Sequence, residues 1–188
     1  MSIATLLEMA AEAMPDREAV VCGDQRLTYP ELFDKAKAAA AQIKAAGAEF
    51  AGYLAVNSPA APIGLFGAAL AGVPYCPINY RLTAEEIGAL LARIAPAMLV
   101  CDAVYLKGVD KPDGVVPVEA AQFPAVGGAL DEPVEGEVAV QLFTSGTTGK
   151  PKAALLTNDN LMSYILGSVE FMSADEADTA LVAATPAT

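Results

Sequence analysis

The sequence contains no histidine and no tryptophan, and lysine and arginine together account for only 11 of its 188 residues. Without histidine there is no Ser-His-Asp triad and no common imidazole base, and most zinc sites are excluded. Acidic residues number 23, so the formal net charge is -12. No basic run is present to neutralise a row of phosphates, which argues against nucleic acid as a partner.

Cysteine is also scarce. Cys22, Cys76 and Cys101 are widely spaced, stand among apolar neighbours and form no CxxC pair. We therefore expect three reduced, buried thiols and neither a metal site nor a redox site. The first residues lack a positive region and carry Glu8 and Glu12 inside their apolar pattern, so they do not form a signal peptide. This composition predicts a cytoplasmic protein.

Charge is missing altogether from residues 50–80, a stretch long enough to span a bilayer by count. Four prolines, at positions 59, 62, 74 and 77, interrupt it. Because proline breaks regular elements, the stretch divides into a strand at 53–56, a helix at 60–71 and a strand at 73–78. We favour this buried strand-helix-strand unit, and a membrane or interfacial segment is the alternative.

Capping signals and apolar spacing predict the remaining elements. Thr28 with Glu31, and Thr83 with Glu86, have the spacing of capping boxes, which mark helix starts. A turn at residues 23–25 lies between two short runs typical of a hairpin. The expected elements are helices 3–14, 29–46, 84–95 and 158–172, and strands 19–23, 26–28, 97–101, 138–143, 153–156 and 181–184.

The order of these elements predicts the fold class. Apolar strands alternate with helices between residues 53 and 101, a pattern typical of an α/β fold with a mostly parallel sheet and helices on both faces. Residues 107–136 are rich in Gly, Pro, Asp and Glu, with only a short VVPV segment, and we expect an irregular surface connection there.

One loop differs chemically from the rest of the chain. Residues 144–152, TSGTTGKPK, place hydroxyls, glycines and lysines between two apolar strands. Free backbone N–H groups, hydroxyls and positive charge suit phosphate oxygens, and a merely polar hairpin turn is the alternative. The nucleotide-binding P-loop does not fit, because Gly146 and Gly149 are too close together and Pro151 stands where a helix should begin.

Residues 143–161, FTSGTTGKPKAALLTNDNL, closely resemble the signature of the acyl-adenylate-forming (AMP-binding) superfamily: acyl-CoA synthetases, adenylation domains of peptide synthetases and luciferases. Segments 15–32 and 57–87 resemble the same family, and PINYRL at 77–82 is more similar to acyl-CoA synthetases than to peptide-synthetase domains. The resemblance implies that residues 1–188 are the N-terminal part of a larger adenylation domain, with the C-terminal domain absent. Ala153 departs from a usual Gly, and Asn158 from a common His or other polar residue.

The resemblance implies an ATP-dependent acid–thiol ligase. Such an enzyme activates a carboxylic acid, here a fatty or aromatic acid, as an acyl-adenylate with release of pyrophosphate, and then transfers it to coenzyme A. Mg²⁺ is implied as well, with its ligand outside this chain. No catalytic residue is implied within the chain. The residues implied to bind ATP or pyrophosphate are Thr144, Ser145, Gly146, Thr147, Thr148, Gly149, Lys150 and Lys152.

Two alternatives remain open at this point. A shortened chain of the same fold would be a non-catalytic binding or interaction module, and an unrelated NTP hydrolase would need a Walker-type loop that the sequence lacks. The sequence is 54% hydrophobic and only 18% charged. We therefore expect some apolar surface to be covered by the remainder of the enzyme or by a partner subunit.

Overall fold

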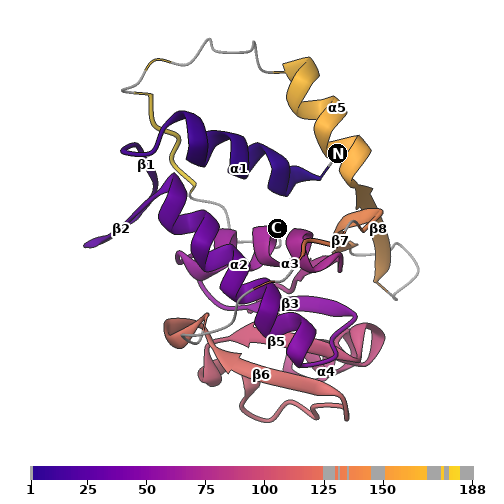
Figure 1. Cartoon of the computed structure of the whole chain (residues 1–188). Helices are drawn as coiled ribbons and strands as arrows, with labels where there is room; N and C mark the ends of the chain where they lie inside the picture. The colour runs from indigo at the N-terminus through magenta and orange to yellow at the C-terminus, as the bar shows by residue number, and fades with distance from the viewer. Residues whose placement is uncertain are drawn as a thin grey trace.

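The computed structural model describes residues 2–124, 130, 132–134, 136–144, 151–168, 175 and 178–182 (Figure 1). Its helices are α1 (Ile3–Ala13), α2 (Tyr29–Ala45), α3 (Ala60–Ala71), α4 (Ala84–Ile94) and α5 (Asn158–Ser168). Its strands are β1 (Glu18–Cys22), β2 (Gln25–Thr28), β3 (Phe50–Leu54), β4 (Tyr75–Pro77), β5 (Ala97–Cys101), β6 (Val115–Glu119), β7 (Val138–Thr144) and β8 (Lys152–Thr157). Two short 3₁₀ segments, η1 (Ala103–Leu106) and η2 (Ala120–Gln122), follow β5 and β6.

The central sheet has six strands in the order β6-β5-β3-β4-β7-β8. Every neighbouring pair is parallel except β7 and β8, which form an antiparallel hairpin at one edge. β1 and β2 form a separate two-stranded sheet. The mostly parallel sheet predicted from the sequence is thus confirmed.

Helices cover both faces of this sheet. Alternate residues of β3 point to opposite sides, so Ala51 and Tyr53 join one apolar core while Leu54 joins the other. The first core contains α1, α2 and α3, and the second is closed by Ile87, Leu91 and other residues of α4. Burial on both faces explains why β5 is apolar and fully buried along its length.

Small residues let α2 and α3 pack closely. Ala36, Ala39 and Ala40 of α2 are fully buried, and a Cβ built at Gly67 of α3 would lie only 2.6 Å from the Cβ of Ala39. Because alanine and glycine have little side-chain volume, the two helix backbones can approach closely here.

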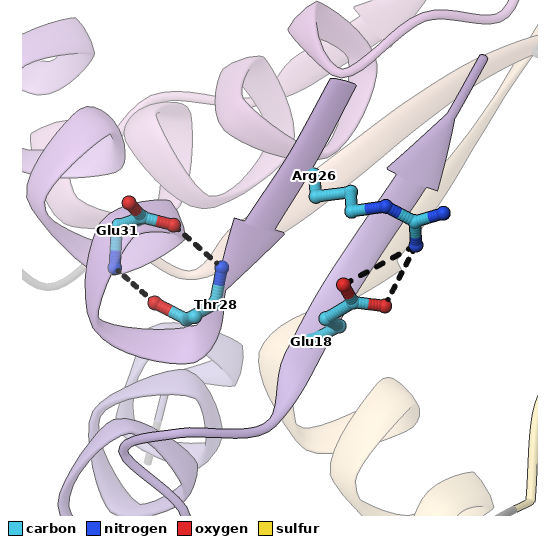
Figure 2. A network of polar contacts seen from close by, with 4 residues as sticks. All are labelled: Glu18, Arg26, Thr28 and Glu31. Atoms are coloured by element: carbon cyan, nitrogen blue, oxygen red, sulfur yellow. Dashed lines mark hydrogen bonds and ion pairs between the residues drawn. The ribbon is translucent and has the colours of Figure 1, made fainter. Parts of the chain in front are cut away.

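The predicted helix starts are confirmed in atomic detail. At α2 the Thr28 backbone donates to the Glu31 carboxylate at 2.8 Å, and the Glu31 backbone donates to the Thr28 hydroxyl at 3.4 Å (Figure 2). Thr83 and Glu86 repeat the arrangement at α4. Figure 2 also shows Arg26 paired with Glu18 across the β1–β2 hairpin, at 3.0 Å.

Residues 50–80 form the buried unit β3-α3-β4, as predicted. Among the residues that the structure describes, none of the helices combines the length and apolarity needed to cross a membrane. The uncharged composition follows from burial, because both faces of these strands are covered.

Three expectations need correction. The VVPV segment is not an irregular connection: it lies in β6, which pairs in parallel with β5 from Ala97↔Val115 to Cys101↔Glu119. Its proline is tolerated because β6 is an edge strand. Cys22 is exposed rather than buried, because it ends β1, a strand whose residues are all exposed or half-buried. Residues 181–182 form no strand, and the final parts of the predicted segments 158–172 and 181–184 lie outside the described residues.

Candidate functional site

The candidate site lies where β7 leaves the sheet at its carboxyl end. β7 is parallel to β4 and β8 returns antiparallel, so Thr144 and Lys152 face each other as the last pair of the ladder. The Thr144 hydroxyl donates to the Lys152 carbonyl at 3.4 Å. Ligands of open parallel sheets bind at the carboxyl ends of the strands, and this hairpin opens there.

The structure brings together two of the eight residues implied by the sequence, Thr144 and Lys152, at the mouth of the hairpin. Both are exposed. The other six lie outside the described residues: Ser145, Gly146, Thr147, Thr148, Gly149 and Lys150. Their phosphate-binding role therefore stays a prediction.

Ala153, the residue that departs from the family pattern, occupies an ordinary strand position. It pairs with Phe143 inside a ladder whose register runs without interruption from Val140↔Leu156 to Thr144↔Lys152. An extended strand residue does not need the conformational freedom of glycine. The alanine therefore fits this hairpin without altering its register.

Arg93, on the last turn of α4, contacts β7 and the residue that precedes β8 at the mouth of the hairpin. Its guanidinium Nη1 donates to the Pro151 carbonyl at 2.6 Å, and its Cζ lies 4.7 Å from the centre of the Phe143 ring. Sequence reasoning missed this residue, because Arg93 and Pro151 are 58 positions apart. The only local signal is a basic residue in the last turn of α4, which has the ordinary explanation of favouring the helix dipole.

Neighbouring strand ends are fixed by hydrogen bonds of their own. The Tyr53 hydroxyl donates to the Val56 carbonyl at 2.6 Å, and the Val56 backbone donates to the Asp102 carboxylate at 3.2 Å. Burial raises the pKa of Tyr53, against a lowering by the hydrogen bond to Ser58. Tyr53 therefore acts as a neutral donor that ties the end of β3 to the loop leading to α3.

The buried thiols near the sheet are unsuited to nucleophilic chemistry. Burial raises the pKa of Cys76 to about 12, although the charge of Arg93 opposes this, and burial raises the pKa of Cys101 to about 11. A thiol is nucleophilic only as thiolate, so both stay inert near neutral pH. Within the described part of the chain, no three His, Cys, Asp or Glu side chains gather in a way that could hold a metal ion.

Asn158, the second departure from the family pattern, joins three separate segments. Its Oδ1 accepts from the backbone N–H of Ile3 at 3.0 Å, and its Nδ2 donates to the Gly136 carbonyl at 2.9 Å. Its own N–H donates to the Glu137 carbonyl at 3.1 Å. Figure 1 shows the result, with the start of α1 beside the start of α5. Asn158 thus anchors the strand that carries the hairpin to the first helix.

Comparison with known proteins agrees with this architecture. A component of the linear gramicidin synthase of Brevibacillus parabrevis is 32% identical over 187 residues, covering 96% of this chain and 4% of that protein. The 2-succinylbenzoate–CoA ligase of Bacillus licheniformis is 28% identical over 187 residues, covering 94% of this chain and 38% of that protein. The chain therefore spans less than half the length of either relative.

The fold also matches a solved adenylate complex. The o-succinylbenzoate CoA synthetase of Bacillus subtilis, bound to its acyl-adenylate intermediate, superimposes with a TM-score of 0.71 at 22% identity, covering 92% of this chain and 47% of that one. The family model described as AMP-binding enzyme matches residues 7–187, nearly the whole chain. This protein belongs to the AMP-binding enzyme family.

Proposed function

We propose that residues 144–152 bind the β- and γ-phosphates of ATP in an enzyme that activates a carboxylic acid as its adenylate. The observation that carries this proposal is the hairpin mouth, where Thr144 and Lys152 pair at the carboxyl end of a parallel sheet. Lys152 and Arg93 bring positive charge to this mouth in a chain whose formal net charge is -12. Phosphate is the ligand that this chemistry favours.

The proposed first step forms one bond and breaks another at the α-phosphorus. A carboxylate oxygen attacks, the bond from the α-phosphorus to the bridging oxygen breaks, and pyrophosphate leaves with the electron pair. Negative charge therefore accumulates on the β- and γ-phosphates. Donors and cations fixed there in advance stabilise the transition state more than the ground state, which lowers the barrier.

In the proposed second step a thiol attacks the acyl carbon and AMP leaves. We favour coenzyme A as the acceptor and a fatty or aromatic acid as the substrate, because PINYRL at residues 77–82 is similar to acyl-CoA synthetases. A second candidate is amino-acid activation in a peptide synthetase, which the similarity to the linear gramicidin synthase component favours. No three His, Cys, Asp or Glu side chains among the described residues could hold a metal ion together, so none of these residues is proposed as a ligand of Mg²⁺.

Binding of inorganic pyrophosphate and of ATP to the 188-residue chain, measured by ³¹P NMR, tests the proposed site. Lys152→Ala and Thr147→Ala should each weaken binding about tenfold, the effect of losing one interaction with a charged group. Lys107→Ala, a charge change just after η1, serves as the control and should leave binding unchanged. Equal affinities for all four proteins would refute the site.

Catalysis is tested separately from binding. We expect no ATP–pyrophosphate exchange by the 188-residue chain alone, because it spans only 38% of the similar CoA ligase. Exchange above background would overturn that expectation. In an enzyme that contains this chain, Lys152→Ala should slow adenylation more than thiol transfer from preformed acyl-adenylate. If the chain binds pyrophosphate or ATP, but a longer protein that contains it catalyses no ATP–pyrophosphate exchange, a non-catalytic binding module is the better description.

A further inference from the structure

One side chain, that of Arg93, contacts the residues that flank the 144–150 segment, Phe143 on one side and Pro151 on the other. Phe143 precedes Thr144 at the end of β7, and Pro151 precedes Lys152 at the start of β8. The Arg93 guanidinium lies over the Phe143 ring, with 4.7 Å between Cζ and the ring centre, and donates to the Pro151 carbonyl at 2.6 Å. The two ends of the segment are thus joined through α4 as well as through each other.

Among the described residues, the pairing of β7 with β8 and a few side-chain contacts hold the hairpin at this point. β8 is an edge strand paired only with β7, and Pro151 has no backbone N–H to give to the ladder. The side-chain contact between Thr144 and Lys152 is long, at 3.4 Å. The contact from Arg93 is shorter and uses a charged donor, so it is the stronger of the two.

The helix that carries Arg93 is firmly placed. Ile87, Leu90, Leu91 and Ile94 of α4 are all buried against the sheet, and a capping box fixes the start of the helix. Because Ile94 is fully buried, the neighbouring Arg93 is tied to the core while its own side chain reaches the hairpin. A planar guanidinium can stack on a ring and donate to a carbonyl at once, which an ammonium does less well.

We propose that Arg93 is a positioning residue, which holds Phe143 and Pro151 in place relative to each other and thereby strengthens phosphate binding at the mouth of the hairpin. This inference rests on the proposed function for its consequence, but the positioning itself does not depend on a ligand. Arg93 also adds a positive charge at the mouth. Positioning and charge are separable, because Arg93→Lys keeps the charge and loses the simultaneous stacking and donation.

The test combines hydrogen exchange with pyrophosphate binding in the 188-residue chain. In Arg93→Ala we expect exchange of peptides covering β7 and β8 to accelerate about tenfold, since local opening sets these rates, and the Kd for inorganic pyrophosphate to rise about tenfold. Arg93→Lys should restore less than half of the exchange protection. Arg81→Ala is the matched control, because Arg81 lies over an aromatic ring, that of Tyr80, at 5.8 Å outside the hairpin. It should change neither quantity.

The outcomes distinguish positioning by Arg93 from a simple effect of its charge. Unchanged exchange in Arg93→Ala overturns the positioning role, even if pyrophosphate binds more weakly, because charge alone would then explain the loss. If Arg93→Lys restores the exchange protection of β7 and β8 completely, the positioning role is also overturned, because the charge alone then suffices. Faster exchange with unchanged pyrophosphate affinity overturns the claimed consequence for binding. If the unaltered chain does not bind pyrophosphate, the proposed function fails, and exchange alone then supports or overturns the positioning by Arg93.

Discussion

Asn158→Ala should destabilise the whole chain, because Asn158 supplies a hydrogen-bond partner that α1 cannot supply for itself. The first backbone N–H groups of a helix have no partner within the helix. Ser2 accepts from Ala4 at 3.2 Å, whereas the buried N–H of Ile3 depends on Oδ1 of Asn158. Alanine would leave that N–H and the carbonyl of Gly136 without their partner.

The magnitude follows from the burial of these two groups. An unsatisfied buried N–H costs about 1–3 kcal/mol, and the partly buried Gly136 carbonyl, which water can reach in the variant, adds about 1 kcal/mol. We therefore expect the free energy of unfolding to fall by about 3 kcal/mol. For a chain of this size, that lowers Tm by about 6–12 °C. The backbone hydrogen bond from the Asn158 N–H to the Glu137 carbonyl survives the substitution, so the start of α5 should keep its connection to the residue before β7.

Urea denaturation followed by circular dichroism measures the loss, and exchange of the Ile3 amide by NMR locates it. Asn160→Ala is the matched control on the same helix turn, because its exposed side chain accepts only from the nearby Thr157 N–H, at 3.2 Å. It should cost less than about 1 kcal/mol. If Asn158→Ala costs no more than Asn160→Ala, or leaves Ile3 exchange unchanged, the capping of α1 by Asn158 is refuted.

Two further predictions concern the helix interface and the thiols. Gly67→Ala should lower the free energy of unfolding by about 1–3 kcal/mol, because the new Cβ would lie 2.6 Å from that of Ala39; adding Ala39→Gly should recover part of the loss in urea denaturation. Iodoacetamide at pH 8 should alkylate the exposed Cys22 alone, because Cys76 and Cys101 are buried and burial raises their pKa to about 12 and about 11. A second adduct on the folded chain, seen by intact-mass spectrometry, would contradict this.

The predicted elements succeed where short-range chemistry decides them. The capping boxes at Thr28 and Thr83 involve residues three positions apart, so their spacing in sequence is their spacing in space. The β3-α3-β4 unit follows from prolines and apolar runs for the same reason. β6 was missed because its role depends on β5 being beside it, and a proline-containing VVPV segment carries no local sign of that neighbour.

The candidate site also combines features that the sequence shows locally with contacts that only the folded chain brings together. The chemistry of residues 144–152 was visible in the sequence, because hydroxyls, glycines and lysines between apolar strands are a local pattern. Arg93 and Asn158 were not recognised for what they contact, because their partners lie 58 and 155 positions away. Nothing in the spacing of such residues shows that a sheet will bring them together.

The sequence by itself therefore determined the helix starts, the strand-helix-strand unit and the hydroxyl, glycine and lysine content of one loop, because each depends on neighbours within a few residues. The tertiary structure decided the strand order, the edge position of β8 and the contact of Arg93 with both ends of the loop. It also decided that Asn158 caps a helix from the opposite end of the chain. These features depend on how the sheet orders its strands, and that order is set by packing the whole core at once.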